Sequence, residues 1–220
     1  MIPGPRIEHQ GPPTPWLLYW VGRLFLALSG WTLSGGAAGP KGIVLGVPHT
    51  SNWDGVLLVM ASWVFRVKLS WIGKHTLFEP PFGWLLRLVG GISVDRRKPQ
   101  GMVEQMAHTF ETTERLYVCV PPAGTRKYTE YWKSGFYYMA LQAQVPIVLG
   151  FLDYRRKIAG LGPGFVPTGD VTADMDRIRA LYEDIDGRYP DKKSRIRLKA
   201  EDEAAEFAEP VAVDDGSEPG

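Results

Sequence analysis

The chain has 220 residues, a formal net charge of +1 and a hydrophobic fraction of 45%. These values predict one domain with a full hydrophobic core. All 25 basic residues but only 16 of the 24 acidic ones lie in residues 1–199, which gives this part a balance of +9. A basic body is typical of proteins that bind anionic lipid, phosphate-bearing substrates or nucleic acid. The sole cysteine, Cys119, lies in an apolar run and excludes an internal disulfide framework.

The amino-terminal part combines a Pro/Gly-rich segment, residues 1–15, with an apolar segment, residues 16–28. The first is expected to be a flexible arm. The second is shorter than the roughly 20 residues that a membrane-spanning helix needs, and it contains Arg23. It fits a signal peptide poorly, which leaves a core helix or a helix lying in a membrane interface. Its Trp and Tyr content favours the interfacial helix, so residues 16–40 are interpreted as a membrane-associating helix and linker.

From residue 41 onward, short apolar runs alternate with segments of helical periodicity. This alternation predicts an α/β fold with a mostly parallel β-sheet flanked by helices, spanning residues 41–199. Residues 154–170 are punctuated by Gly and Pro and are expected to form a hairpin or loop, and the acidic residues 200–220 a disordered tail. The expected strands are 42–47, 68–73, 92–94, 116–120 and 146–152; the expected helices are one after Asn52, 82–89, 99–114, 133–144 and one capped by Thr172.

The first strand leads into Pro48, His49 and then Asp54. Pro48 ends the strand, and Ser51 or Asn52 can cap the helix that follows, so the reactive side chains fall on a strand-to-helix turn. His49 lies just before the helix and Asp54 in its first turn, which brings the two side chains together. In such a dyad the imidazole accepts a proton from a hydroxyl, and the carboxylate fixes the tautomer and stabilises the imidazolium.

Two further polar turns follow apolar strands, at residues 95–97 and 121–127. The carboxyl ends of parallel strands lie along one edge of a sheet, so all three turns are predicted to meet at one crevice. These segments resemble the motifs of the glycerolipid acyltransferase family, whose best-known members are the 1-acylglycerol-3-phosphate acyltransferases. The resemblance covers roughly residues 41–152. Its motifs are His49-x4-Asp54, the strand ending in Asp95-Arg96, the block at residues 122–126, and Val145-Pro-Ile147.

The resemblance implies transfer of a fatty acyl group from acyl-CoA or acyl carrier protein to a lysophospholipid hydroxyl. His49 would be the general base and Asp54 would orient it, with no metal and no covalent enzyme intermediate. The implied substrate-binding residues are Arg96 and Arg126 for the acceptor phosphate, Lys74 for additional charge, and Gly124 and Thr125 for backbone contacts to an anion. The implied partners are membrane lipids, and the expected location is the cytoplasmic face of the cell membrane, as a monotopic or peripheral protein. No nucleic-acid partner is expected, because the basic residues are scattered and no helix-turn-helix, aromatic RNA-binding block or zinc finger appears.

Ala123 departs from the family pattern, which has Glu at this position of its Pro-Glu-Gly-Thr-Arg block. A methyl group accepts no hydrogen bond and anchors no arginine. Three explanations stay open: an acceptor other than lysophosphatidate, such as an aminolipid or glycolipid; an inactive acyltransferase fold that binds lipid; and a deliberate alteration. A zinc enzyme is disfavoured because His49, His75 and Cys119 lack metal-ligand spacing.

Overall fold

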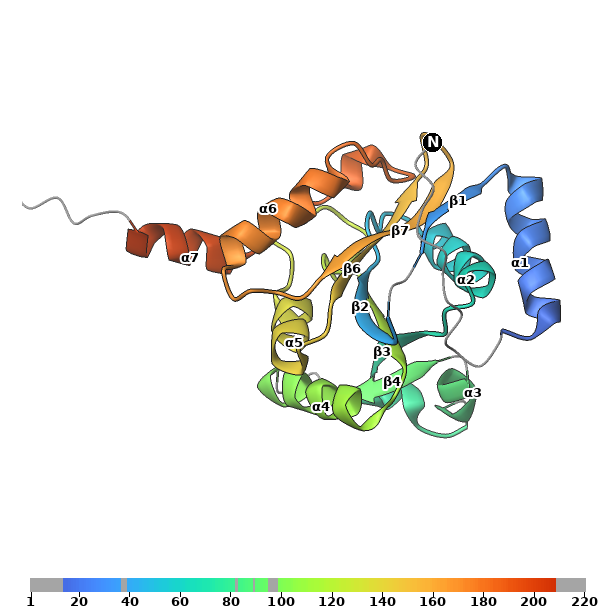
Figure 1. The fold of residues 1–220 in the computed structure, drawn as a ribbon, viewed down its shortest axis with the longest axis horizontal. Coiled ribbons are helices and arrows are strands. Elements are labelled where there is room, and N and C mark those ends of the chain that lie inside the picture. Colours follow the sequence, from blue (N-terminus) through green and yellow to red (C-terminus); the bar gives the residue numbers. More distant parts are fainter. Residues whose placement is uncertain (1–13, 37–38, 82, 89, 95–98, 209–220) are drawn as a thin grey trace, which may run out of the picture.

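The computed structural model describes residues 14–36, 39–81, 83–88, 90–94 and 99–208. In this part of the chain, one sheet has seven strands in the order β1-β7-β6-β2-β5-β3-β4, with helices on both sides (Figure 1). Neighbouring strands run parallel except β6 and β7, which confirms the mostly parallel α/β fold. The strands are β1 Thr32–Gly35, β2 Lys41–Leu45, β3 Leu69–Lys74, β4 Gly91–Val94, β5 Leu116–Val120, β6 Ile147–Asp153 and β7 Ile158–Phe165.

Helices α1 to α6 confirm the expected order, with shifts of a few residues at their ends, whereas α7 was not expected. The α-helices are α1 Trp16–Ser29, α2 Trp53–Phe65, α3 Gly83–Leu88, α4 Pro99–Thr112, α5 Gly135–Ala143, α6 Val171–Tyr182 and α7 Lys199–Ala208. Two short 3-10 helices are η1 His75–Phe78 and η2 Pro190–Lys192.

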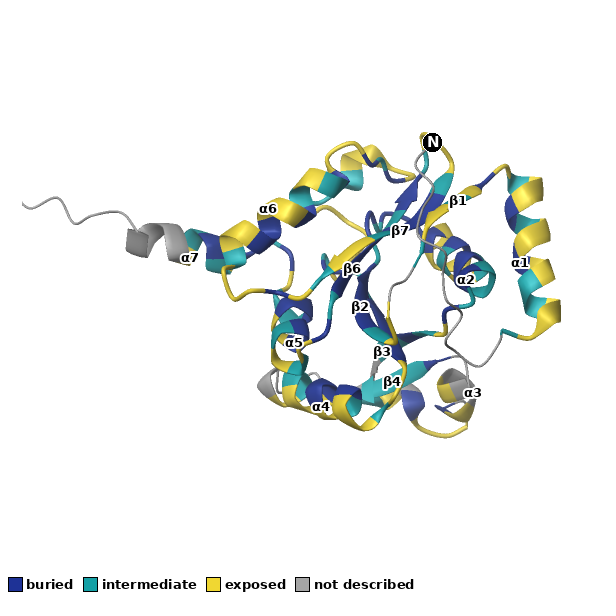
Figure 2. Cartoon of the chain, in the orientation of Figure 1, coloured by how far each residue is buried: buried dark blue, intermediate teal, exposed yellow. Residues whose placement is uncertain are grey.

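The sheet is buried on both faces, and β2 shows why its sequence is continuously apolar. Ile43 and Leu45 point into a core shared with α4, α5 and α6, whereas Val44 points into a second core shared with α1 and α2. Successive strand residues alternate between faces, so a strand covered on both sides requires apolar residues throughout. Figure 2 shows the central strands buried between these helices.

Helix α1 packs on α2 through small and apolar residues while its outer side faces solvent (Figure 2). A Cβ on Gly22 would lie 2.7 Å from the carbonyl oxygen of Met60, so glycine permits this close approach. Gly30 ends the helix in the left-handed conformation, and the next residue, Trp31, donates its N–H to the carbonyl of Leu26. Within the described residues, no helix is long and apolar enough to cross a membrane.

The edge strand β1 was not predicted, and its neighbour β7 decides between the two alternatives for residues 154–170. The expected linker after α1 contains β1, which pairs with β7, and residues 154–170 contain β7, which forms the hairpin alternative with β6. Both strands contain glycines, which predicted a linker or loop from the sequence alone. A Cβ on Gly35 would lie 1.9 Å from the carbonyl oxygen of Leu161, and one on Gly160 would lie 2.2 Å from the ring of Phe151. These glycines are required by close packing, although glycine usually marks loops.

The carboxyl-terminal predictions need two corrections. Asp170, and not Thr172, caps α6, because its carboxylate accepts the N–H of Ala173 at 3.0 Å. The expected disordered tail is wrong for residues 200–208, which belong to α7, and residues 209–220 lie outside the described part. Glu201 is buried, accepts the N–H of Leu198 and forms an ion pair with Arg179 at 2.7 Å. This acidic residue therefore anchors the helix.

Candidate active site

The turn between β2 and α2 brings together the two residues of the predicted dyad. Nδ1 of His49 lies 3.3 Å from Oδ2 of Asp54. The imidazole is 29% exposed and the carboxylate side chain only 4% exposed, so the pair has one accessible and one buried member. With Nδ1 donating to the carboxylate, Nε2 is the nitrogen that can accept a proton.

Asp54 is the centre of a hydrogen-bond network. Its Oδ2 accepts the backbone N–H groups of Thr50 at 2.7 Å and Ser51 at 2.8 Å. Its Oδ1 accepts the hydroxyl of Tyr154 at 2.6 Å. Of the two expected capping residues, Ser51 accepts the N–H of Trp53, the first residue of α2, with its hydroxyl, whereas the side chain of Asn52 makes no capping bond. The carboxylate thus closes the turn as well as contacting His49.

These bonds decide the charge state of Asp54. Burial raises the pKa of this carboxyl, but the bonds from His49, Tyr154 and the backbone N–H groups outweigh it and leave the pKa below its usual value. Conversely, burial and the neighbouring carboxylate raise the pKa of Tyr154. The site therefore contains a carboxylate and a neutral phenol that donates to it.

A cavity of about 1150 Å³ opens beside the dyad. It is lined largely by apolar side chains from α2, β3, β5 and α5, including Leu58, Phe65, Trp71, Val120 and Met139. Cys119 lies on its wall, and burial raises the pKa of this thiol to about 12, so it is a neutral structural side chain. The cavity can hold a long apolar chain with one end at the dyad.

The turn after β5 lies at the same sheet edge and holds three of the predicted substrate-binding residues. Thr125 and Arg126 are exposed, and Gly124 has a φ of +66°. The N–H of Gly124 donates to the carbonyl of Pro121 at 3.0 Å and closes the turn. The backbone contact of Gly124 and Thr125 to an anion stays a prediction. The Thr125 hydroxyl accepts the N–H of Lys127.

The remaining predicted substrate-binding residues are placed only in part. Lys74 ends β3 at the same sheet edge, paired in register with Val94. Arg96 lies outside the described residues, as does the rest of its turn. Ala123 packs against the core shared with α4, α5 and α6. Among the described residues, no group of three or more His, Cys, Asp or Glu side chains is arranged to hold a metal ion.

Two residues near the dyad were not singled out by the sequence analysis. Tyr154 follows β6, which is parallel to β2, so its strand order signals a place beside His49. Arg188 is exposed and lies 5.9 Å from the ring of Trp53, in a segment whose Tyr189 N–H donates to the Thr50 hydroxyl. Neither residue belongs to a short motif, so only the folded chain reveals them.

Comparison with known proteins agrees with this geometry. A family model described as acyltransferase matches residues 37–148, more than half of the chain. The fold is similar to the crystal structure of the 1-acyl-sn-glycerophosphate (LPA) acyltransferase PlsC from Thermotoga maritima, with a TM-score of 0.52 and 14% identity over 79% of this chain and 80% of that chain. At this identity the similarity shows a shared fold. No curated protein matches the chain.

Proposed function

The chain belongs to the acyltransferase family, and we propose that it transfers a fatty acyl group from a thioester donor to the hydroxyl of a lysophospholipid. The observation that carries this proposal is a His–Asp dyad, with Nδ1 and Oδ2 3.3 Å apart, that lines a large and mostly apolar cavity. The donor is acyl-CoA or acyl carrier protein. The acceptor hydroxyl sits against His49, and the acyl chain lies in the cavity.

The reaction needs one base and no covalent enzyme intermediate. Nε2 of His49 takes the proton of the acceptor hydroxyl as its oxygen attacks the thioester carbonyl carbon. The tetrahedral intermediate collapses, the carbon–sulfur bond breaks, and the imidazolium returns the proton to the leaving thiolate. Asp54, held ionised by its hydrogen bonds, stabilises the imidazolium formed in between.

The cationic side chains at this sheet edge suit an anionic acceptor. Arg126 is exposed in the turn after β5, and Arg188 is exposed next to Trp53, the first residue of α2. A guanidinium group matches a phosphate because it donates parallel N–H bonds in a fixed geometry. We assign phosphate contact to Arg126, with Arg96 and Lys74 as additional cations and Arg188 at the rim.

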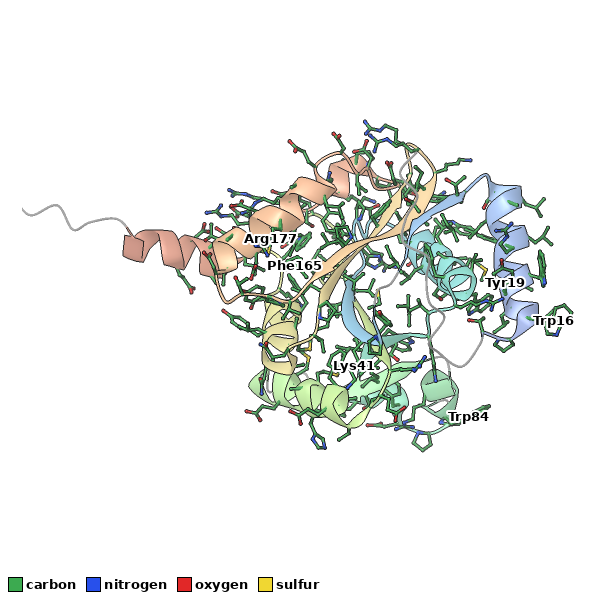
Figure 3. All side chains as sticks on the ribbon, in the orientation of Figure 1. Trp16, Tyr19, Lys41, Trp84, Phe165 and Arg177 are labelled. Carbon is green, nitrogen blue, oxygen red and sulfur yellow. The ribbon has the colours of Figure 1, made fainter. Side chains whose placement is uncertain are left out.

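Helix α1 supports a location on the membrane surface. Trp16 is 74% exposed and Leu28 is 80% exposed, and Trp20 and Leu24 are exposed on the same short helix. Figure 3 shows Trp16 projecting outward from α1. A helix too short to span a bilayer, with exposed Trp and Leu, is suited to lie in the interface, where lysolipid and acyl chains reside. We propose peripheral attachment to the cytoplasmic face of the membrane.

The experiment that tests the proposal combines purified protein, acyl-CoA and vesicles carrying one lysolipid at a time. Thiol release and the mass of the lipid product are followed for wild type and Ala123→Glu. Product formed with a lysophospholipid supports the proposal, and product formed only with an aminolipid or glycolipid changes the acceptor class. Silence in both proteins contradicts it and favours a lipid-binding protein with the acyltransferase fold. Silence in wild type with rescue by Ala123→Glu assigns the loss to that position.

A further inference from the structure

We propose that Tyr154 is a positioning residue of the active site: its hydroxyl holds Asp54 so that the other carboxylate oxygen stays directed at His49. This inference rests on the proposed acyl transfer by the dyad. Tyr154 lies 100 residues beyond Asp54 in sequence and outside the segment that the family model matches. Its position therefore extends the site beyond the motifs.

The geometry divides the two oxygens of Asp54 between two tasks. Oδ1 accepts from the Tyr154 hydroxyl at 2.6 Å, and Oδ2 faces Nδ1 of His49 at 3.3 Å. Short hydrogen bonds to an ionised acceptor are the strong ones. Oδ2 also accepts the backbone N–H groups of Thr50 and Ser51, so Tyr154 is the side chain that holds the opposite oxygen. A carboxylate that is bonded at both oxygens cannot rotate without losing a bond, so the phenol and the two amides together fix the angle at which Oδ2 meets the imidazole.

Tyr154 is itself held rigidly enough to act in this way. Its ring meets the ring of Trp31 edge-on, with centroids 5.0 Å apart and an interplanar angle of 88°. Its backbone N–H donates to the carbonyl of Asp186 at 2.9 Å. The turn that follows is fixed by Asp153, which accepts the N–H of Arg155 at 3.0 Å. Aromatic packing and backbone bonds thus fix both ends of the residue.

The phenol is surrounded by charged and polar groups from several elements. Asp54 and Ser51 face it from the turn before α2, and Arg188 acts on it from the carboxyl-terminal segment. Burial and Asp54 raise the pKa of Tyr154, while Arg188 and Ser51 lower it, and the net change is a rise. The phenol therefore keeps its proton near neutral pH and remains a donor to the carboxylate.

The chain provides a matched control for this pair. The hydroxyl of Tyr137 donates to the buried carboxylate of Asp174 at 3.0 Å, in the core between α5 and α6. Both tyrosines lose the same atom when changed to phenylalanine, and both changes leave a buried carboxylate with one donor fewer. Tyr137 does not line the cavity. A difference between the two variants in catalysis therefore reports position and not the general loss of a hydrogen bond.

The kinetic test compares Tyr154→Phe and Tyr137→Phe with wild type in the acyl-transfer assay. We expect Tyr154→Phe to lower kcat about tenfold, by analogy with the roughly 10–100-fold losses when a partner that orients a metal-ligating side chain is removed, with KM for donor and acceptor unchanged. Tyr137→Phe should lower the melting temperature by about as much as Tyr154→Phe does, because each variant loses one hydrogen bond to a buried carboxylate. Tyr137→Phe should leave kcat unchanged. Equal kcat in wild type and Tyr154→Phe, or equal losses in the two variants, would overturn the proposal.

A second measurement does not depend on activity. The carboxyl ¹³C resonance of Asp54, assigned by its absence in Asp54→Asn, is followed against pH in wild type and both variants. Loss of the Tyr154 bond removes one of the interactions that lower the pKa of Asp54, so its titration should move to higher pH in Tyr154→Phe and stay in place in Tyr137→Phe. An unmoved titration in Tyr154→Phe would overturn the proposal. Inactive wild-type protein would instead contradict the proposed function.

Discussion

Asp54 and Asp174 occupy similar places in different regions of the molecule. Each lies in the first turn of a helix, α2 or α6, and each is almost fully buried, with 3% and 0% of its surface exposed. Each accepts a tyrosine hydroxyl, and each also accepts a backbone N–H from the segment before its helix, which for Asp174 is that of Thr168 at 2.7 Å. The same local solution therefore appears on both sides of the sheet.

The two regions differ in the other side chains that contact the carboxylate. Asp54 contacts the partly exposed His49 beside a cavity, whereas Asp174 contacts Arg177 at 3.7 Å and the hydroxyl of Thr168. A buried, hydrogen-bonded aspartate at the start of a helix therefore has, by itself, a structural role, which is to hold the preceding segment. It becomes part of a candidate active site when a titratable side chain and an accessible space lie on its other side.

Changing the charge of Asp54 should have the largest effect. Asp54→Asn keeps the shape but removes the charge that stabilises the imidazolium and allows the wrong tautomer of His49. We expect kcat to fall by about 10²–10⁴. Asp174→Asn serves as the control and should keep kcat within about twofold. Steady-state rates of acceptor-dependent thiol release check both, and similar losses in the two variants would remove the distinction between the regions.

The effect on stability should be largest at Asp174. Asp174→Ala leaves the Tyr137 hydroxyl and the N–H of Thr168 without their acceptor in the core, which we expect to lower the free energy of unfolding by about 3 kcal/mol. The folded fraction should keep the turnover of wild type. Urea unfolding combined with the rate per folded molecule measures both quantities. A stable but inactive Asp174→Ala protein would show that this region also serves the reaction.

The pH dependence of stability should separate wild type from Asp54→Asn. The pKa of Asp54 is lower in the folded protein than its ordinary value, so its ionisation contributes stability above about pH 4. This contribution disappears as the pH falls through the lowered value. Wild type should therefore lose stability more steeply than Asp54→Asn below about pH 4, as measured by urea unfolding between pH 6 and pH 3. Parallel curves would contradict the hydrogen-bond network around this carboxylate.

The smallest expected effect is on membrane binding through the exposed side of α1. α1, packed on α2, exposes Trp16 and Leu24, whereas Val166 is an exposed apolar side chain in the segment between β7 and α6. We expect Trp16→Ser with Leu24→Ser to weaken binding to vesicles of anionic lipid by about tenfold, because each loses buried apolar area in the interface. Val166→Ser should have no effect in vesicle sedimentation. Equal binding by all three proteins would contradict membrane docking through α1.

The sequence predicted what depends on local spacing. His49 lies in the turn before α2 and Asp54 in the first turn of that helix, so a strand followed directly by a helix brings the two side chains together. The periodic helices α2 and α4 and the apolar strands β2 and β5 were predicted for the same reason. Tyr154 reaches Asp54 only because β6 lies next to β2 in the sheet, and strand order is a property of the whole fold.

The missed elements have a similar explanation. β1 and β7 contain glycines that are needed for close packing, and these glycines resemble loop signals. α7 is acidic, but its buried Glu201 forms an ion pair with Arg179 and accepts the N–H of Leu198. Arg179 becomes a neighbour of Glu201 only in the folded chain. Composition alone therefore predicts disorder for residues 200–208, although they belong to a helix that Glu201 anchors to the domain.

The most direct test of the central claim measures thiol release from acyl-CoA with and without a lysophospholipid acceptor, in wild type and His49→Ala. His108→Ala is the control, since His108 is an exposed histidine of α4 next to Glu111. The proposed mechanism predicts acceptor-dependent release in wild type and in His108→Ala, and a loss of about 10²–10⁴ in His49→Ala. Acceptor-dependent release that survives in His49→Ala would contradict the role of His49 as the base.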